Sequence, residues 1–327
     1  MRFLAYRLRS HPRRGYSGAA NHDQGLAGKI DTLAQAQSAK TSEAVPAAAP
    51  PAGNLLPMGV KIYGSLDRGV ECVTHTGASK TTLSHVPSTT ANGRSVIGLD
   101  FRRNVGVKYA AVGKAEIGIF LDSGSSGQGS RTFARQLYVG ADTPLCSITF
   151  GSQYTMLFYR LHGSDILGPN IYGLGSIDAY IPNARADNSV VWRAKLDKLA
   201  LGTHYSFGCE TANTTVPSSA VCSGEDATDA SRCRGWSAMA CYDDPKFAIA
   251  AAIGTQRGGT CAQASFFNSG VPIAMSSDGD KDRRMSVNGY VRFSALTQGA
   301  GCLGRKVDTR NTDVKQYVTW LIGEYAL

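Results

Sequence analysis

The chain has 327 residues, a net charge of +9, and 43% apolar but only 18% charged residues. This length suits one large domain or two ordinary ones, and eight cysteines are too sparse for a small disulfide scaffold. No run of about 18 apolar residues occurs, which excludes a helical membrane span but not membrane strands, whose alternation leaves little hydropathy signal. The basic residues are scattered rather than clustered, which argues against nucleic-acid binding.

The first 58 residues are predicted to lie outside the folded domain. Several arginines precede the first acid, Asp23, but the apolar stretch of about 7–15 residues that a secretory signal needs is missing. Ala34-Gln35-Ala36 nevertheless reads as a cleavage site. Residues 38–58 are rich in alanine and proline, which indicates a linker. We therefore divide the chain into an N-terminal segment with its linker, 1–58, and a β domain, 59–327.

From Val60 onward, apolar and polar residues alternate with a period of two, which is the pattern of a half-buried strand. In the first segment the polar positions are Lys61, Ser65 and Asp67. No segment has a convincing helical period. The pattern predicts an all-β, antiparallel chain of about twelve strands, at 60–67, 97–101, 115–122, 137–141, 146–153, 188–195, 199–207, 234–242, 246–255, 284–293, 295–307 and 314–327.

Short and long connections take turns between these strands. This asymmetry is not expected in a soluble sandwich, whereas an outer-membrane barrel has short periplasmic turns and long outer loops. Small side chains on the second strand face suit a water-filled lumen, which needs no packed core. The tight breaks lie near 142–145, 196–198, 243–245 and 293–295, and the long polar breaks at 74–93, 154–187, 209–232 and 256–282.

Signs of catalysis or of a bound cofactor are weak throughout. The cysteine spacings match no zinc pattern, although some of the cysteines are close enough in sequence to pair. Residues 278–282 resemble the start of a calcium loop but lack its downstream acid. No nucleophile constellation and no phosphate-binding loop is present. We expect no enzyme activity, no catalytic residues, no metal and no cofactor.

Short motifs in a fixed order carry a family resemblance. Residues 62–71 (IYGSLDRGVE), 133–140 (FARQLYVG), 149–155 (TFGSQYT) and 185–190 (RADNSV) occur in that order, and 205–208 (YSFG) follow. Over residues 60–327 the order and spacing of these motifs resemble a general diffusion porin of Gram-negative bacteria, of the type found in Burkholderia- and Neisseria-like organisms.

The resemblance implies a transmembrane β-barrel of 16 strands in the outer membrane. It also implies a homotrimer, surrounded by lipid and lipopolysaccharide, whose water-filled pores let ions and small hydrophilic solutes diffuse passively. The third long loop, 155–184 here, would fold into the barrel and set Asp165 and Asp178 opposite basic side chains of the wall. Charged clusters of this kind let a pore discriminate between ions.

The sequence departs from the family at three wall positions that usually hold a base, where it has Ser65, Val96 and Ser152. The transverse field should therefore be flatter than in the family, and we expect only weak anion selectivity. The residues expected to line the pore or its constriction are Lys61, Ser65, Asp67, Val96, Ser152, Asp165, Asp178, Arg185 and Arg193.

Twelve predicted strands against an implied sixteen lead us to expect a barrel domain that is incomplete at its C-terminal end. Unpaired strand edges are costly in lipid, so the sequence favours a chain that stays open and aggregates or is degraded over a closed barrel of twelve strands. The alternative function is that of a secreted or surface β-rich binding protein, which uses its long loops for recognition and buries its apolar strand face.

Overall fold

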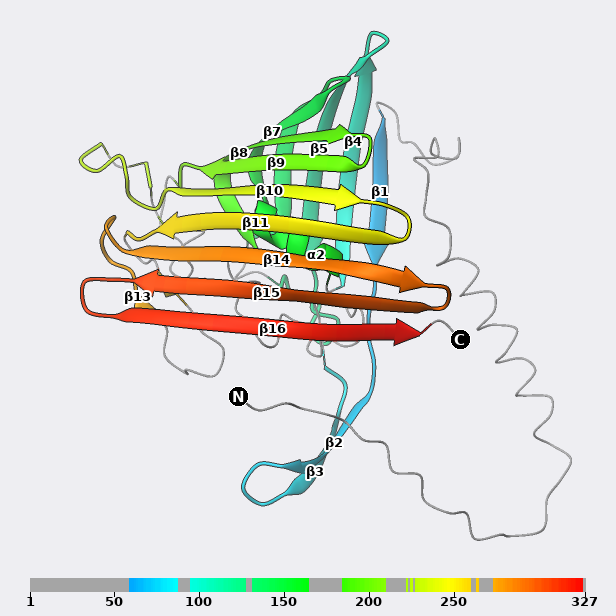
Figure 1. Cartoon of the computed structure of the whole chain (residues 1–327), viewed down its shortest axis with the longest axis vertical. Coiled ribbons are helices and arrows are strands. Elements are labelled where there is room, and N and C mark those ends of the chain that lie inside the picture. Colours follow the sequence, from blue (N-terminus) through cyan, green and yellow to red (C-terminus); the bar gives the residue numbers. More distant parts are fainter. Residues whose placement is uncertain are drawn as a thin grey trace, which may run out of the picture. The chain divides into compact units, whose positions relative to one another are not determined.

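The computed structural model describes residues 59–87, 95–127, 131–164, 184–209, 222, 224–225, 227–259, 263–264 and 273–325. Its main element is one antiparallel sheet, in which strands adjacent in the sheet follow one another along the chain (Figure 1). All twelve predicted strands are present, which confirms the all-β class. They are β1 (Val60–Ser65), β4 (Val96–Val105), β5 (Tyr109–Gly118), β6 (Gln136–Asp142), β7 (Cys146–Tyr154), β8 (Arg185–Leu196), β9 (Leu199–Ser206), β10 (Gly235–Asp243), β11 (Phe247–Arg257), β14 (Lys281–Phe293), β15 (Leu296–Asp308) and β16 (Asp313–Tyr325).

Two small strand pairs and one helix of the described residues lie between these strands. β2 (Glu71–Thr76) pairs with β3 (Thr81–His85), and β12 (Gln263–Ala264) pairs with β13 (Ile273–Ala274). The helix α2 (Met156–Ser164) corrects the expectation that no helix is present. It is nine residues long, too short for its period to stand out in the sequence. No helix in the described ranges is long and apolar enough to cross a membrane.

Cross-strand partners share a face of the sheet, so the pairing register assigns each side chain to one of two faces. We call the face that α2 covers the inner face, because the Met156 amide donates a 2.9 Å hydrogen bond to the Ser237 hydroxyl. Ser237 pairs with His204 on β9 and with Gly254 on β11. The opposite face, which carries Trp236, is the outer face.

The outer face is apolar and open. Met285 and Ile249 are 60% and 56% exposed, although both lie within long strands of the sheet. In water such a face would be an aggregation liability, whereas in lipid each of these side chains has a favourable environment. Further exposed apolar residues of this face are Ile97, Leu137, Val139, Phe150, Tyr205, Trp236, Ile253, Val287, Val291, Tyr317 and Leu321.

Within the described sheet, β1 and β16 are the edge strands, each paired with one neighbour (Figure 1). Short turns join β4 to β5, β6 to β7, β8 to β9, β10 to β11 and β14 to β15, so these turns share one end of the sheet. The long connections lie at the other end, together with the short turn between β15 and β16. The expectation of an unstable open chain stays a prediction, as does the division at residue 58, because 1–58 lie outside the described residues.

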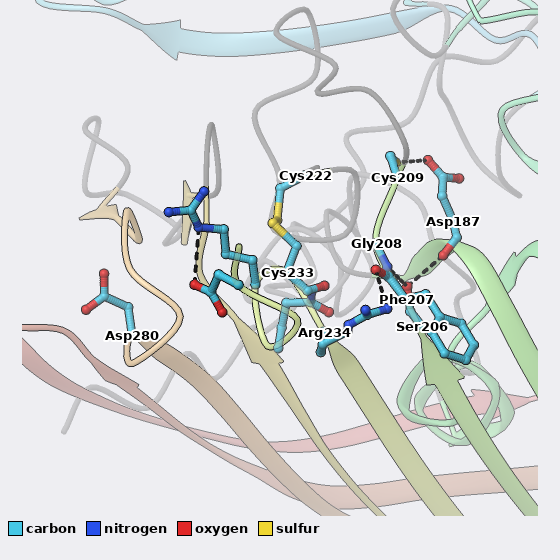
Figure 2. Close-up of a disulfide and its surroundings, with 12 residues drawn as sticks. Asp187, Ser206, Phe207, Gly208, Cys209, Cys222, Cys233, Arg234 and Asp280 are labelled. Carbon is cyan, nitrogen blue, oxygen red and sulfur yellow. Dashed lines mark hydrogen bonds and ion pairs between the residues drawn. A yellow bond between two sulfur atoms is a disulfide. The ribbon is translucent and has the colours of Figure 1, made fainter. Parts of the chain in front are cut away.

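A disulfide between Cys222 and Cys233 ties the β9–β10 connection to the start of β10 (Figure 2). Both cysteines are fully buried, and they pack in one cluster with Met275 and Val307. Nearby, the Cys209 thiol donates a 3.1 Å hydrogen bond to the Asp187 carboxylate (Figure 2). Burial and this carboxylate raise the pKa of the Cys209 thiol to about 12, so it stays protonated and does not attack the disulfide.

Replacing Cys222 and Cys233 together with serine is expected to lower the free energy of unfolding by about 2–4 kcal/mol, because the crosslink restricts the unfolded chain. Urea unfolding of the full chain in detergent, without reductant, measures the change. The matched control is Cys72→Ser/Cys302→Ser, since both of these cysteines are free and exposed. Equal stability of the two double variants would contradict a disulfide in the folded protein.

Candidate functional site

The inner face of the sheet is lined by polar side chains that are nonetheless buried. Groups of this kind require hydrogen-bonding or charged partners, or ordered water, because burying them without partners costs free energy. An inner face of this composition contacts water and protein rather than lipid. The buried polar residues that the register places on it include Glu116, Gln136, Thr149, Ser189, His204, Ser206, Ser237, Asp282, Arg284, Ser286, Asn288 and Arg305.

One network of alternating charges runs along the wall formed by β1, β4 and β5. The Tyr63 hydroxyl donates a 2.6 Å hydrogen bond to Glu116 and accepts one of 3.1 Å from Lys114. Lys114 also pairs with Asp100 at 2.8 Å, and Arg135 pairs with Glu116 at 2.6 Å. Each base in this network therefore has an acid beside it, which fixes the side chains and cancels much of their field.

The helix α2 rests on the inner face and joins this network. The Phe158 ring stacks on Tyr154 with 4.2 Å between centroids, and the Tyr154 hydroxyl accepts a 2.8 Å hydrogen bond from Arg135. The Tyr159 hydroxyl accepts a 3.0 Å hydrogen bond from Arg193. The helix also contacts β9, β10, β11, β14 and β15, and Figure 1 shows it behind β11 and β14. The described start of the segment 155–184 is therefore turned onto the wall.

A second cluster of charges lies on the inner face of β14 and β15. Asp282 accepts hydrogen bonds from Arg305 at 2.7 and 3.0 Å and forms an ion pair with Arg284 at 3.3 Å. All three side chains are almost fully buried. On β9, which β10 and β11 separate from β14, neither ring nitrogen of the buried His204 has a hydrogen-bond partner in the described part of the chain. We refer to Asp282, Arg284 and Arg305 as the buried triad.

Five residues expected at the pore lie on the inner face or beside α2. Lys61 pairs in register with Asp100, and Ser65 pairs with the buried Val96. Arg193 contacts Tyr159 of α2, as described above. The Arg185 guanidinium lies 5.5 Å from the centre of the Tyr154 ring, so both arginines are next to aromatic residues at the start of the segment 155–184.

Of the other expected residues, Asp67 and Ser152 lie apart from this group. Asp67 follows β1, and its amide donates a 2.9 Å hydrogen bond to the Ser95 hydroxyl. Ser152 pairs in register with Leu137, an outward-facing residue, just before a register shift in β7. Asp165 and Asp178 lie outside the described residues.

Sequence reasoning did not single out Lys114, Arg135 or the buried triad as wall residues. Lys114 directly precedes the predicted strand 115–122 and is in phase with its polar position Glu116, so the alternation could have been extended to it. Arg135 lies within one of the family-like motifs, residues 133–140. The triad has no sequence signal, because its members meet only through strand pairing.

An antiparallel sheet with an apolar outer face, a polar inner face and a helix on the inner side defines a membrane channel protein of the β class. The family comparison is specific on this point. The model of the Gram-negative porin family matches residues 32–327, and the chain belongs to that family. It is an outer-membrane porin, which decides against a secreted binding protein. No curated protein matches the sequence significantly.

Solved porin structures share the fold at low sequence identity. The anion-selective porin from Comamonas acidovorans matches with a TM-score of 0.60 and 14% identity, over 81% of this chain and 73% of that one. Salmonella typhi OmpF, in a complex with daunomycin, gives 0.55 and 15%, over 81% and 74%. The trimer form of Vibrio cholerae OmpT gives 0.53 and 17%, over 81% and 72%.

Proposed function

We propose that the protein forms a water-filled channel for passive diffusion of ions and small hydrophilic solutes, catalyses no reaction and needs no cofactor. The observation that carries this proposal is the division of the sheet into an apolar outer face and a polar inner face. It assembles as a homotrimer among outer-membrane lipid and lipopolysaccharide. The trimer form of the similar OmpT supports this assembly.

The segment 155–184 narrows the channel, with α2 as its first part. Asp165 and Asp178 face the wall that carries Lys61, Arg185 and Arg193, and Ser65, Asp67 and Val96 line the remainder. The contacts of α2 with the inner face support this arrangement, because they place the start of the segment against the wall.

The channel prefers anions only weakly. Three bases of the wall have an acid as an ion-pair partner, namely Lys114 with Asp100, Arg135 with Glu116, and Arg102 with Asp142. Paired charges produce a weaker field across a pore than separated rows of one sign do. The excess of base over acid in the sequence leaves a small preference for anions.

The reversal potential in a salt gradient across a planar bilayer tests this function. We expect discrete conductance steps and an anion-to-cation permeability ratio modestly above one. Arg193→Gln is expected to move the ratio toward one, because Arg193 has an aromatic hydroxyl rather than an acid as its partner. Lys108→Gln, in the exposed turn between β4 and β5, is the matched control and should leave the ratio unchanged. Cation selectivity, sharp anion selectivity or the absence of conductance would contradict the proposal.

A further inference from the structure

Two methionine side chains meet beneath the first turn of α2, on the inner face of β9 and β10. Met156, the first residue of the helix, is fully buried. A Cβ atom added at Gly202 would lie 2.4 Å from the Met156 sulfur and 2.8 Å from the methyl carbon of Met239. The two thioethers therefore converge over Gly202, whose lack of a side chain leaves the room that they occupy.

Strand register places a histidine beside this pair. His204 lies two residues from Gly202 on the same face of β9. On β10, Ser237 is the partner of His204, and Met239 is the partner of Gly202. The Met156 amide is bonded to Ser237, and its sulfur lies over Gly202, so its side chain crosses this square of four positions along one diagonal. His204 and Met239 stand at the other two corners, about 7–8 Å apart and within reach of long side chains.

The imidazole of His204 lacks the partners that a buried polar group needs. Its side chain is 3% exposed, yet neither ring nitrogen has a hydrogen-bond partner among the described residues. Leaving such a group unpaired costs about 1–3 kcal/mol, so most buried polar groups are satisfied. A neutral imidazole is also the commonest metal ligand in proteins. An ion held between His204 and the two thioethers would give one of its nitrogens a partner.

The chemistry of these donors selects the kind of ion. Thioethers are soft ligands that favour Cu(I), and imidazole also suits copper. No acidic residue occupies the inner-face positions of 200–206, 237–241 or 250–256, so the charge of a divalent ion would not be balanced. In the described part of the chain, no three His, Cys, Asp or Glu side chains form a group that could hold a metal ion. Uncharged soft donors therefore fit a soft monovalent cation.

The site can be reached from water in the channel. A cavity of about 440 Å³ opens at the end of the sheet where the short turns lie, and Met239 lines it together with Tyr159 and Arg193. The Arg193 guanidinium is held by its 3.0 Å hydrogen bond to the Tyr159 hydroxyl. Cys241, a buried free thiol two residues from Met239 on the same face, is a further soft donor beside this path. An entry path is one requirement of a metal site.

We propose that Met156, Met239 and His204 bind one Cu(I) ion. The ion keeps its oxidation state and joins the first residue of α2 to β9 and β10. Binding therefore favours the docked helix over a released one. The site is separate from the channel function proposed above, and conduction does not require the ion.

Competition for Cu(I) between the full chain in detergent and bicinchoninate, without oxygen, tests the site after accessible thiols have been blocked with iodoacetamide. The variant Met156→Leu/Met239→Leu removes both sulfurs and nearly preserves side-chain volume. We expect affinity to fall at least roughly a hundredfold, because residues that merely orient a metal ligand already contribute about 10–100-fold. Met275→Leu/Met285→Leu removes one buried and one exposed thioether elsewhere and should bind as the unchanged chain does.

Two further variants separate the donors. His204→Leu should weaken binding at least roughly tenfold, and Cys241→Ser should leave it unchanged. X-ray absorption at the copper edge should show both sulfur and imidazole neighbours. Cu(I) should also slow cleavage of the unchanged chain between residues 156 and 164 by an added protease, because the bound ion holds α2 on the wall.

Several outcomes would overturn the site. They are an unchanged affinity in Met156→Leu/Met239→Leu or in His204→Leu, and an equal loss in Met275→Leu/Met285→Leu. A loss confined to Cys241→Ser would assign the ion to that thiol. Heat-modifiable electrophoretic mobility shows whether each variant is folded, so a loss of binding counts only in a folded chain. A chain that conducts but does not bind Cu(I) retains the channel and loses the site.

Discussion

Replacing Asp282 with alanine is expected to lower the free energy of unfolding by about 3–5 kcal/mol. The Asp282 carboxylate is the acid of the buried triad and lies 2.7 Å from Arg305 and 3.3 Å from Arg284. Without it, two buried guanidinium groups lose this counter-charge in a region of low dielectric constant. The cost arises because two buried guanidinium groups lose an anionic partner that bulk water does not replace.

Urea unfolding in detergent, followed by tryptophan fluorescence, measures the effect. Asp308→Ala is the matched control, because Asp308 also pairs with bases on the sheet but its side chain is 42% exposed. This substitution should lower the free energy of unfolding by less than about 1 kcal/mol. A second variant, Asp282→Leu/Arg305→Met, removes a charge of each sign and should recover part of the lost stability. Two results would contradict this explanation of the stability loss. One is an Asp282→Ala variant as stable as the control, and the other is a double variant less stable than Asp282→Ala.

The strands could be predicted from the sequence because each one separates two very different environments. Along β11, exposed residues such as Ile249 and Ile253 alternate with buried ones such as Ala250 and Ala252. In a soluble sheet the contrast between faces is often blurred at the ends of strands. Here it continues through strands of up to 13 residues, so a period of two is visible with a single sequence.

The elements that sequence reasoning missed lack this contrast. The β2–β3 hairpin lies in a segment interpreted as a long polar connection, and most of its residues are exposed. Its own backbone ladder and the 2.6 Å contact between Glu71 and His85 hold it together. The helix α2 depends on contacts with Leu303 and Trp320, which follow it by well over a hundred residues. Tertiary contacts of this kind leave no local pattern.

The candidate site was predictable only in part, for a related reason. Alternation places Lys61 and Ser65 on one face, and the structure agrees. Which acid stands beside which base depends on register, and a slip of one residue exchanges the two faces. The pairs of Lys114 with Asp100 and of Arg305 with Asp282 therefore emerge only once the strands are aligned.

Replacing Phe158 with alanine is expected to release α2 from the inner face and to raise single-channel conductance. Phe158 is 9% exposed and packs in one cluster with Tyr154, Leu303, Val318 and Trp320. Truncating a buried phenylalanine costs about 3–5 kcal/mol. An isolated helix of nine residues is marginal in water, so this packing contributes most of what holds α2 in place.

Adding a bulky side chain beneath α2 should also release the helix and raise single-channel conductance. A Cβ atom added at Gly254 would lie 2.7 Å from Leu157 Cδ1, so Gly254→Leu forces the helix away from the wall. Ile249→Ala, on the outer face of the same strand, is the matched control and should leave conductance unchanged.

Cleavage between residues 156 and 164 by an added protease should increase in both inner-face variants and not in the control. A cavity at Phe158 and a clash at Gly254 share no effect except displacement of α2, so a joint rise in conductance would assign the constriction to the segment that this helix begins. Unchanged conductance in both, despite increased cleavage, would place the constriction elsewhere.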